Sequence, residues 1–158
     1  MKRAGFSLIE LMVVVAIIAL LAMLAIPSFS RFIAKTKRTE AYVNLNALYI
    51  AQKAYWAEHG RYSTQLIGDQ GVGWKPEGYH GGGESEQFFY TYGFPGGEGV
   101  SCFTGRLLTP SSHLSQAKAT ENEFIAVAAG DIDGDGEPDV LLIDQNGVIK
   151  IIKDDLMD

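Results

Sequence analysis

The chain of 158 residues has very little cysteine and histidine, with one cysteine, Cys102, and three histidines. A single cysteine excludes an intramolecular disulfide, so the C-terminal region has to be fastened in another way. Cys102 is either a small buried apolar residue or an intermolecular link. The sequence also lacks the zinc-protease, serine-hydrolase and phosphate-loop signatures, and it therefore does not indicate an enzyme.

Charge is missing from a long stretch near the N-terminus. Residues 11–26 contain no charged and no polar side chain, and between Phe6 and Ile26 only Glu10 is charged. A bilayer core of ~30 Å needs about 20 helical residues, and this stretch is long enough. Apolar residues occupy every face of the expected helix, unlike a helix that lies on a globular core. The stretch therefore predicts a membrane-spanning helix.

The charges that are present are unevenly distributed. Residues 1–40 carry six basic and two acidic side chains, whereas residues 41–158 carry seven basic and 17 acidic ones. The distal part is thus strongly acidic. Because duplex binding needs a basic face, nucleic acid is not expected as the main partner.

The order of features at the N-terminus is unusual. Lys2 and Arg3 are followed at once by small residues and then by the apolar run, whereas a secretory signal has its small-residue cleavage site after the run. Cleavage after Gly5 would give Phe6 a new α-amino group that is mostly cationic at neutral pH. Glu10 either stays wet near the membrane interface or pairs with such an amine in a neighbouring copy, which sets the register between helices.

Residues 5–10, with the sequence GFSLIE, and the apolar run after them resemble the prepilin signature of type IV pilins and type II secretion pseudopilins. The resemblance implies that a membrane prepilin peptidase cuts after Gly5 and methylates the N-terminus of Phe6. It also implies that Glu10 is the assembly glutamate. Pro27 falls where such pilins have their helix-kinking proline, and a proline kinks a helix because it lacks the N–H donor.

This resemblance implies an α+β, pilin-like fold, in which a long N-terminal α-helix, membrane-spanning in its first half, packs on a small antiparallel β-sheet. It further implies a single-pass inner-membrane precursor, in contact with membrane lipid and the inner-membrane assembly machinery. The precursor then joins a homo-oligomeric filament, as an extracellular pilus or a periplasmic pseudopilus. We expect a structural subunit of a type IV pilus-like filament. A type II secretion pseudopilin and a non-polymerising, membrane-anchored calcium-binding or adhesive module remain alternatives.

The remainder of the chain divides by composition. Residues 28–59 contain no glycine or proline, and apolar side chains recur at helical spacing, which predicts an amphipathic helix that ends at Gly60. Residues 60–112 hold 13 of the 18 glycines and predict long loops, with one strand around residues 87–94. The predicted layout is a leader at 1–5, an assembly helix at 6–30 and a globular head at 31–158, which consists of the helix 31–59, the variable loops 60–112 and a C-terminal sheet with an acidic loop at 113–158.

The acidic loop follows a calcium-binding pattern. Five acidic residues occupy loop positions 1, 3, 5, 7 and 9, with Gly136 at the sharp turn of position 6. They are Asp131, Asp133, Asp135, Glu137 and Asp139. Position 12 is Leu142 in place of the bidentate Glu, which predicts Ca²⁺ binding of modest affinity, with Glu137 contributing its backbone carbonyl. A solvated turn without a cation is the alternative.

Two further strands are expected after the acidic loop. Residues 140–144 and 148–153 are apolar runs joined across Asn146–Gly147, and Asn-Gly between such runs is a strong hairpin signal. A bound cation would tie the acidic loop to this last hairpin and take the place of a disulfide.

Overall fold

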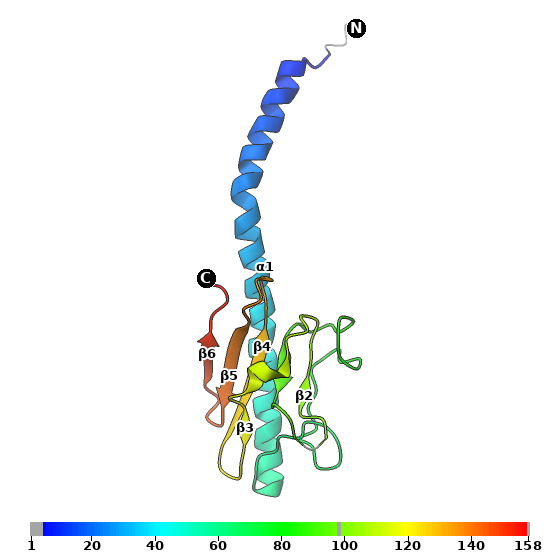
Figure 1. Cartoon of the computed structure of the whole chain (residues 1–158), viewed down its shortest axis with the longest axis vertical. Coiled ribbons are helices and arrows are strands. Elements are labelled where there is room, and N and C mark those ends of the chain that lie inside the picture. Colours follow the sequence, from blue (N-terminus) through cyan, green and yellow to red (C-terminus); the bar gives the residue numbers. More distant parts are fainter. Residues whose placement is uncertain (1–4, 98, 158) are drawn as a thin grey trace. The chain divides into compact units, whose positions relative to one another are not determined.

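The computed structural model describes residues 5–97 and 99–157, and it begins with one long helix (Figure 1). Helix α1 runs from Leu8 to His59 without interruption, also through Pro27. It ends where the sequence predicts, because Gly60 takes a left-handed φ of 69° and donates its N–H to the Trp56 carbonyl at 2.8 Å. The chain forms two compact units, Met1–Ile33 and Ala34–Asp158, and α1 contributes to both.

In the second unit, one stripe of α1 is buried. Its members recur at intervals of three and four residues, as expected for a helix with one face on a core. They are Ala34, Arg38, Ala41, Leu45, Leu48, Gln52 and Tyr55. The predicted amphipathic helix is confirmed, with Ala51 half-buried at the edge of the stripe.

The sheet of the second unit has six strands, and every pairing between them is antiparallel. The strands are β1 (Thr91–Gly93), β2 (Cys102–Phe103), β3 (Lys118–Ala119), β4 (Phe124–Gly130), β5 (Asp139–Asp144) and β6 (Ile149–Lys153). Their order is β2-β1-β4-β5-β6, and β3 pairs with β4 beside β1. The predicted α+β arrangement of a long helix on an antiparallel sheet is thereby confirmed.

Side chains alternate between the two faces of the central strands. Phe124, Leu141 and Ile143 share one apolar cluster with Leu45 and Leu48 of α1. The alternate positions face the opposite side of the sheet, where they pack with Leu114 of the 3-10 helix η1 (Ser111–Leu114). Because both faces are covered, the central strands read as nearly continuous apolar runs.

Two strands differ from the sequence prediction. The strand expected at residues 87–94 is only three residues long, because the Phe88 and Phe89 carbonyls accept hydrogen bonds from Arg106 and Leu107 in a loop. The longest strand, β4, lies within the predicted C-terminal sheet region 113–158, but the sequence does not single it out as a strand, and FIAVAAG is rich in alanine. The C-terminal hairpin is confirmed, with Gly147 in the left-handed region at a φ of 75°.

Candidate assembly motif and cation site

The first residues of the described chain place the predicted cleavage point outside the helix. Gly5, Phe6 and Ser7 have no helical structure, and Phe6 is 79% exposed. Ser7 donates from its N–H and from its hydroxyl to the Glu10 carboxylate, at 2.8 and 2.7 Å, and Glu10 N–H donates back to the Ser7 hydroxyl at 3.3 Å. This reciprocal capping box satisfies helix donors that have no partner within the helix.

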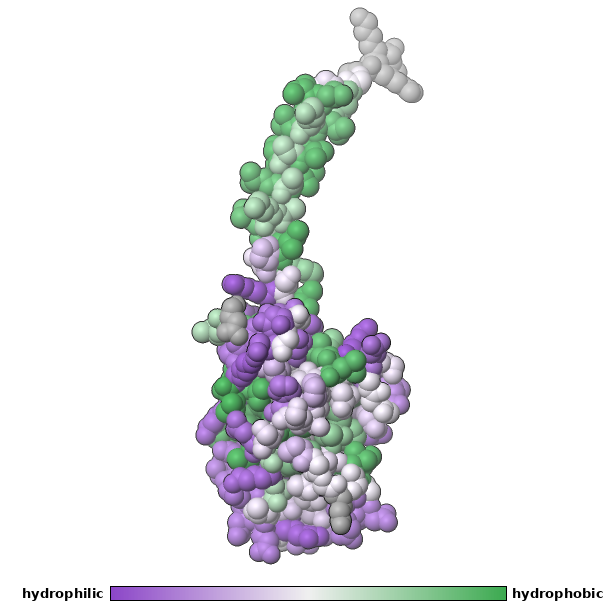
Figure 2. Space-filling view, in the orientation of Figure 1, coloured by the Kyte–Doolittle hydropathy of each residue, from purple (hydrophilic) through white to green (hydrophobic). Residues whose placement is uncertain are grey.

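The N-terminal part of α1 is mostly apolar. Its large apolar side chains from Leu8 to Ile33 are exposed in the structure (Figure 2). By length and composition, α1 contains a segment that is able to cross a membrane. Exposed apolar surface of this extent needs a lipid or protein environment.

The acidic loop gathers three of its predicted ligands. The loop is closed by hydrogen bonds from its own backbone amides. The carboxylates of Asp131, Asp133 and Asp135 accept these bonds, at 2.7 to 3.2 Å, from N–H groups two to five residues further on. One oxygen of each lies within 4.8 Å of the others and of an oxygen of Asp155. The arrangement has the oxygen chemistry that a hard divalent cation prefers.

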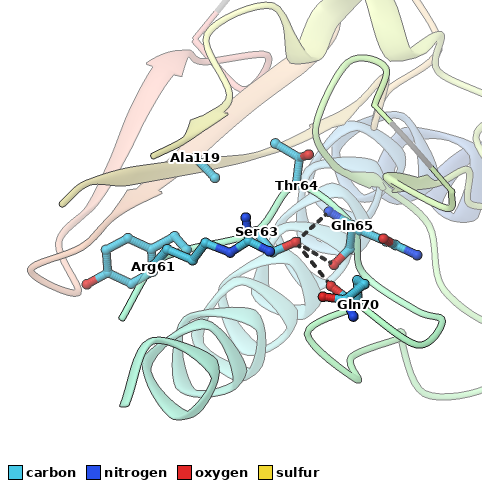
Figure 3. Close-up of a pocket in the computed structure, with 7 residues that line it drawn as sticks. Arg61, Ser63, Thr64, Gln65, Gln70 and Ala119 are labelled. Atoms are coloured by element: carbon cyan, nitrogen blue, oxygen red, sulfur yellow. Dashed lines mark hydrogen bonds between the residues drawn. The ribbon is translucent and has the colours of Figure 1, made fainter. Parts of the chain in front are cut away.

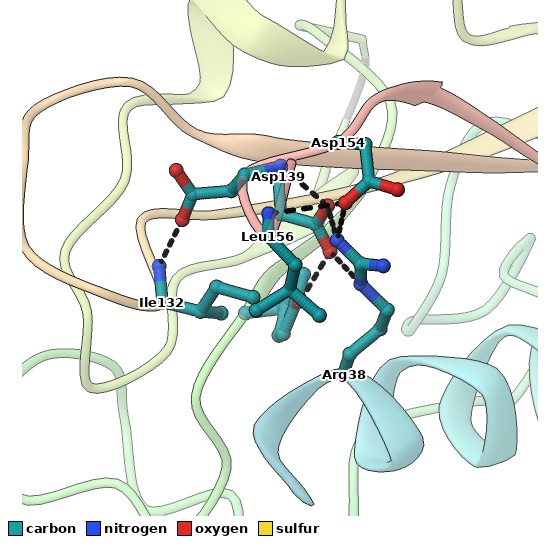
Figure 4. Close-up of polar contacts among 7 residues, drawn as sticks. Arg38, Ile132, Asp139, Asp154 and Leu156 are labelled. Atoms are coloured by element: carbon teal, nitrogen blue, oxygen red, sulfur yellow. Dashed lines mark hydrogen bonds and ion pairs between the residues drawn. The ribbon is translucent and has the colours of Figure 1, made fainter. Parts of the chain in front are cut away.

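Asp139 is not part of this group, which corrects the predicted ligand set. Its buried carboxylate accepts bonds from Arg38 Nε at 2.9 Å and Nη2 at 2.6 Å, and from the Tyr90 hydroxyl at 2.7 Å (Figure 4). Asp139 is the first residue of β5, and the buried guanidinium on α1 takes up both of its oxygens. The Glu137 side chain pairs instead with Lys153, and coordination through the Glu137 backbone carbonyl remains a prediction.

Arg38 joins the helix to the C-terminal end of the chain. In addition to Asp139, it pairs with Asp154, which follows β6 (Figure 4). Burial alone would lower the pKa of Arg38, but the hydrogen bonds to Asp154 and Asp139 outweigh this and raise it. The hydrogen bond from Arg38 lowers the pKa of Asp154. Arg38 is therefore a permanent cation at this junction.

Asp155 is the ligand candidate that sequence reasoning missed. Burial raises the pKa of this carboxyl group, the hydrogen bond from Ile132 N–H lowers it, and the carboxylates of Asp133, Asp135 and Asp131 raise it. Asp155 lies 20 residues beyond Asp135, so no spacing rule connects them. The only signal in the sequence is the acidic pair at 154–155 directly after a strand.

A polar pocket of about 360 Å³ lies beside the last turns of α1 (Figure 3). Its lining includes Arg61, Thr64 and Ala119, and the Ser63 hydroxyl lies at the centre of its hydrogen bonds. The buried Gln52 side chain holds the backbone of Ser63 through two hydrogen bonds, of 2.6 and 3.2 Å. These hydrogen bonds stabilise the loop that follows the helix.

Cys102 and Glu40 show how burial affects ionisable groups in the head. Cys102 is a half-buried free thiol on β2, and burial raises its pKa. Glu40 accepts hydrogen bonds from Phe89 N–H at 3.0 Å and from the Tyr92 hydroxyl at 2.8 Å. Burial nevertheless raises the pKa of Glu40, because desolvation outweighs these bonds.

Comparisons with known proteins point to the N-terminal region. The family model described as the prokaryotic N-terminal methylation motif matches residues 1–26. The type IV major pilin protein PilA of Myxococcus xanthus (strain DK1622) is 56% identical over 62 residues, which are 39% of this chain and 28% of that protein. The match thus covers less than a third of the relative's length. This chain carries a prepilin-type N-methylation motif and shares homology with a type IV major pilin over that stretch.

Proposed function

We propose that this protein is a structural subunit of a type IV pilus-like filament. The observation that carries the proposal is the prepilin-type motif at the start of a helix whose next residues are apolar and exposed. Such a helix is stored in a membrane and then packs against copies of itself, where apolar contacts replace the lipid. The homology with a type IV major pilin supports the same function.

Processing and assembly are assigned to specific residues in this proposal. Prepilin peptidase cuts after Gly5, the new N-terminus at Phe6 is methylated, and Glu10 pairs with the Phe6 amine of a neighbouring subunit. A carboxylate inside an apolar helix bundle is tolerated when it is paired. The subunit resides in the inner membrane before assembly, in contact with the assembly machinery, and in an extracellular filament afterwards.

The filament proposal is tested by charge reversal at the assembly position. Glu10→Lys is expected to remain in the membrane fraction and to abolish filaments, because two cations then face each other at the subunit contact. Glu84→Lys makes the same charge change on an exposed loop of the head and serves as the matched control. Electron microscopy with an antibody to this protein provides the readout, and filaments formed by the Glu10→Lys variant would contradict the proposal.

The same images separate the alternatives. Long surface filaments from the wild-type chain support a pilus, whereas short filaments confined to the periplasm indicate a type II secretion pseudopilin. A cleaved and methylated chain that forms no filament at all indicates a membrane-anchored module. Mass spectrometry of the mature N-terminus detects the loss of residues 1–5 and the added methyl group independently of assembly.

We also propose that the acidic loop binds Ca²⁺. Support comes from the oxygens of Asp131, Asp133 and Asp135, which lie within the span of one coordination sphere. The lack of a bidentate Glu at loop position 12 leaves the affinity modest. EDTA is expected to lower the melting temperature of the full chain in detergent, and added Ca²⁺ is expected to restore it. An unchanged melting temperature in both conditions would remove the site.

A further inference from the structure

One buried oxygen near the acidic loop has no partner. Asp155 is 1% exposed, and its Oδ2 accepts a hydrogen bond from Ile132 N–H at 2.9 Å. In the part of the chain that the structure describes, its Oδ1 is the one buried side-chain nitrogen or oxygen that lacks a hydrogen bond. A buried carboxylate oxygen without a donor is costly, and such atoms are rare in folded proteins.

The surroundings of Asp155 make this cost larger in the absence of a cation. An oxygen of Asp155 lies within 4.8 Å of an oxygen on each of Asp131, Asp133 and Asp135. Four carboxylates this close together repel one another unless a cation lies between them. Two oxygens on opposite sides of a Ca²⁺ ion, each at about 2.4 Å, are separated by about 4.8 Å, so the cluster matches one coordination sphere.

We infer that Asp155 is the fourth carboxylate ligand of this cation site, and that the bound cation fastens the C-terminal turn, residues 154–157, to the acidic loop. The inference rests on the cation proposed above. It differs from the pattern in the sequence, which assigns the last carboxylate of the site to Asp139. Asp139 helps to position Asp155, because its carboxylate accepts the Asp155 N–H at 3.3 Å and also pairs with Arg38.

The C-terminal turn is held at several points in addition to the proposed ligand. Asp154 pairs with Arg38 and accepts the Leu156 N–H at 3.0 Å, and the Leu156 side chain packs at the edge of the main core (Figure 4). Removing the cation leaves Asp155 buried beside three like charges, and outward movement of Asp155 relieves this repulsion. Because Asp154 is its direct neighbour, the same movement loosens the contact with Arg38. Cation removal is therefore expected to release this turn before the rest of the head.

Calorimetric titration of the full chain in detergent with CaCl₂ tests the ligand assignment. Asp155→Asn keeps the shape and the acceptor for Ile132 N–H, but it is expected to weaken Ca²⁺ binding by about tenfold or more, because it removes one ligand charge. Asp133→Asn lies on the exposed part of the loop and is expected to weaken binding similarly. Asp69→Asn, an exposed change outside the cluster, is the matched control and should bind like the wild type.

Melting curves distinguish a ligand from a residue with only a structural role. In CaCl₂ the wild type should melt at a higher temperature than Asp155→Asn, whereas in EDTA the variant should equal or exceed the wild type, because it removes the buried repelling charge. Hydrogen exchange should accelerate in EDTA for residues 154–157, while a peptide around Leu45 stays protected. A variant that is less stable than the wild type in both conditions would overturn the inference, as would equal acceleration in the two peptides.

The failures of the two proposals are distinguishable. If the wild type binds no Ca²⁺, then both the cation and the role of Asp155 are wrong, and the filament proposal is unaffected. If Asp133→Asn weakens binding but Asp155→Asn binds with wild-type affinity, then the loop holds the cation and only the inference about Asp155 is overturned.

Discussion

Replacing Arg38 with alanine should cost the head more stability than any change at its exposed charges. The Arg38 side chain is 11% exposed and makes a two-pronged contact with Asp139, whose side chain is completely buried. Arg38→Ala leaves that carboxylate buried without its cation. Breaking a buried pair in this way costs about 3 to 5 kcal/mol.

The contacts that survive in the variant place the expected cost near the lower end of this range. Asp139 keeps the hydroxyl of Tyr90 at 2.7 Å and the N–H of Asp155 at 3.3 Å. We therefore expect a loss of roughly 3 kcal/mol in the free energy of unfolding. For a head of this size, that loss lowers the melting temperature by about 10 °C.

Urea denaturation of the full chain in detergent, followed by tryptophan fluorescence, measures the effect. Asp154→Asn is the comparison within the same network, because the Asp154 side chain is 32% exposed and its pairing should contribute at most about 1 kcal/mol. Arg106→Ala removes an exposed arginine and should be neutral. A loss below about 1 kcal/mol for Arg38→Ala, or an equal loss for Asp154→Asn, would refute the reasoning.

Two further predictions concern the helix and the hairpin. Because burial raises the pKa of Glu40 in the folded state, wild-type stability should fall as pH rises from the ordinary carboxyl range through the raised pKa. Glu40→Gln lacks this ionisation. In urea denaturation, the stability of the variant relative to the wild type should therefore be higher at pH 7 than at pH 4. A relative stability that is unchanged or lower at pH 7 would contradict this. Gly147→Ala should destabilise the head by about 1 to 2 kcal/mol in a thermal melt, because Gly147 has a φ of 75° and an added Cβ would lie 3.2 Å from the Tyr49 ring. Gly73→Ala is the control, because Gly73 has a similar φ but no atom close to an added Cβ, so this change should destabilise the head less. Equal destabilisation by the two changes would show that the contact with the Tyr49 ring contributes nothing.

Local patterns in the sequence were sufficient to predict the long helix and the last hairpin. The uncharged run at 11–26, the spacing of Leu45 and Leu48, and the Asn146–Gly147 turn each depend on neighbours within a few residues. Strand β4 escaped prediction because its alanines have low β-propensity and because both of its faces are buried, which removes the polar alternation of a half-exposed strand.

The cation site was only partly predictable for a different reason. The spacing of Asp131, Asp133 and Asp135 within one loop is a local signal, and the structure brings these three together. Whether an acidic residue faces the loop or the core depends on partners far away in the chain. Arg38, which lies 101 residues before Asp139 in the chain, pairs with the buried Asp139 carboxylate. Asp155, near the C-terminus, joins the group of loop carboxylates instead.

The packing of α1 on the sheet has a consequence for the order of events during synthesis. Leu45 and Leu48 pack in one cluster with Phe124 and Ile143, which leave the ribosome about 80 to 100 residues later. At 5–20 residues per second, the inner stripe of the helix waits roughly 4 to 20 s for the strands that cover it. Throughout that interval an unpaired apolar face lies directly after a hydrophobic segment that is already made. A chain that stops before β4 lacks Phe124, Leu141 and Ile143, so part of this stripe stays exposed in the unfinished fragment, which is then prone to aggregate.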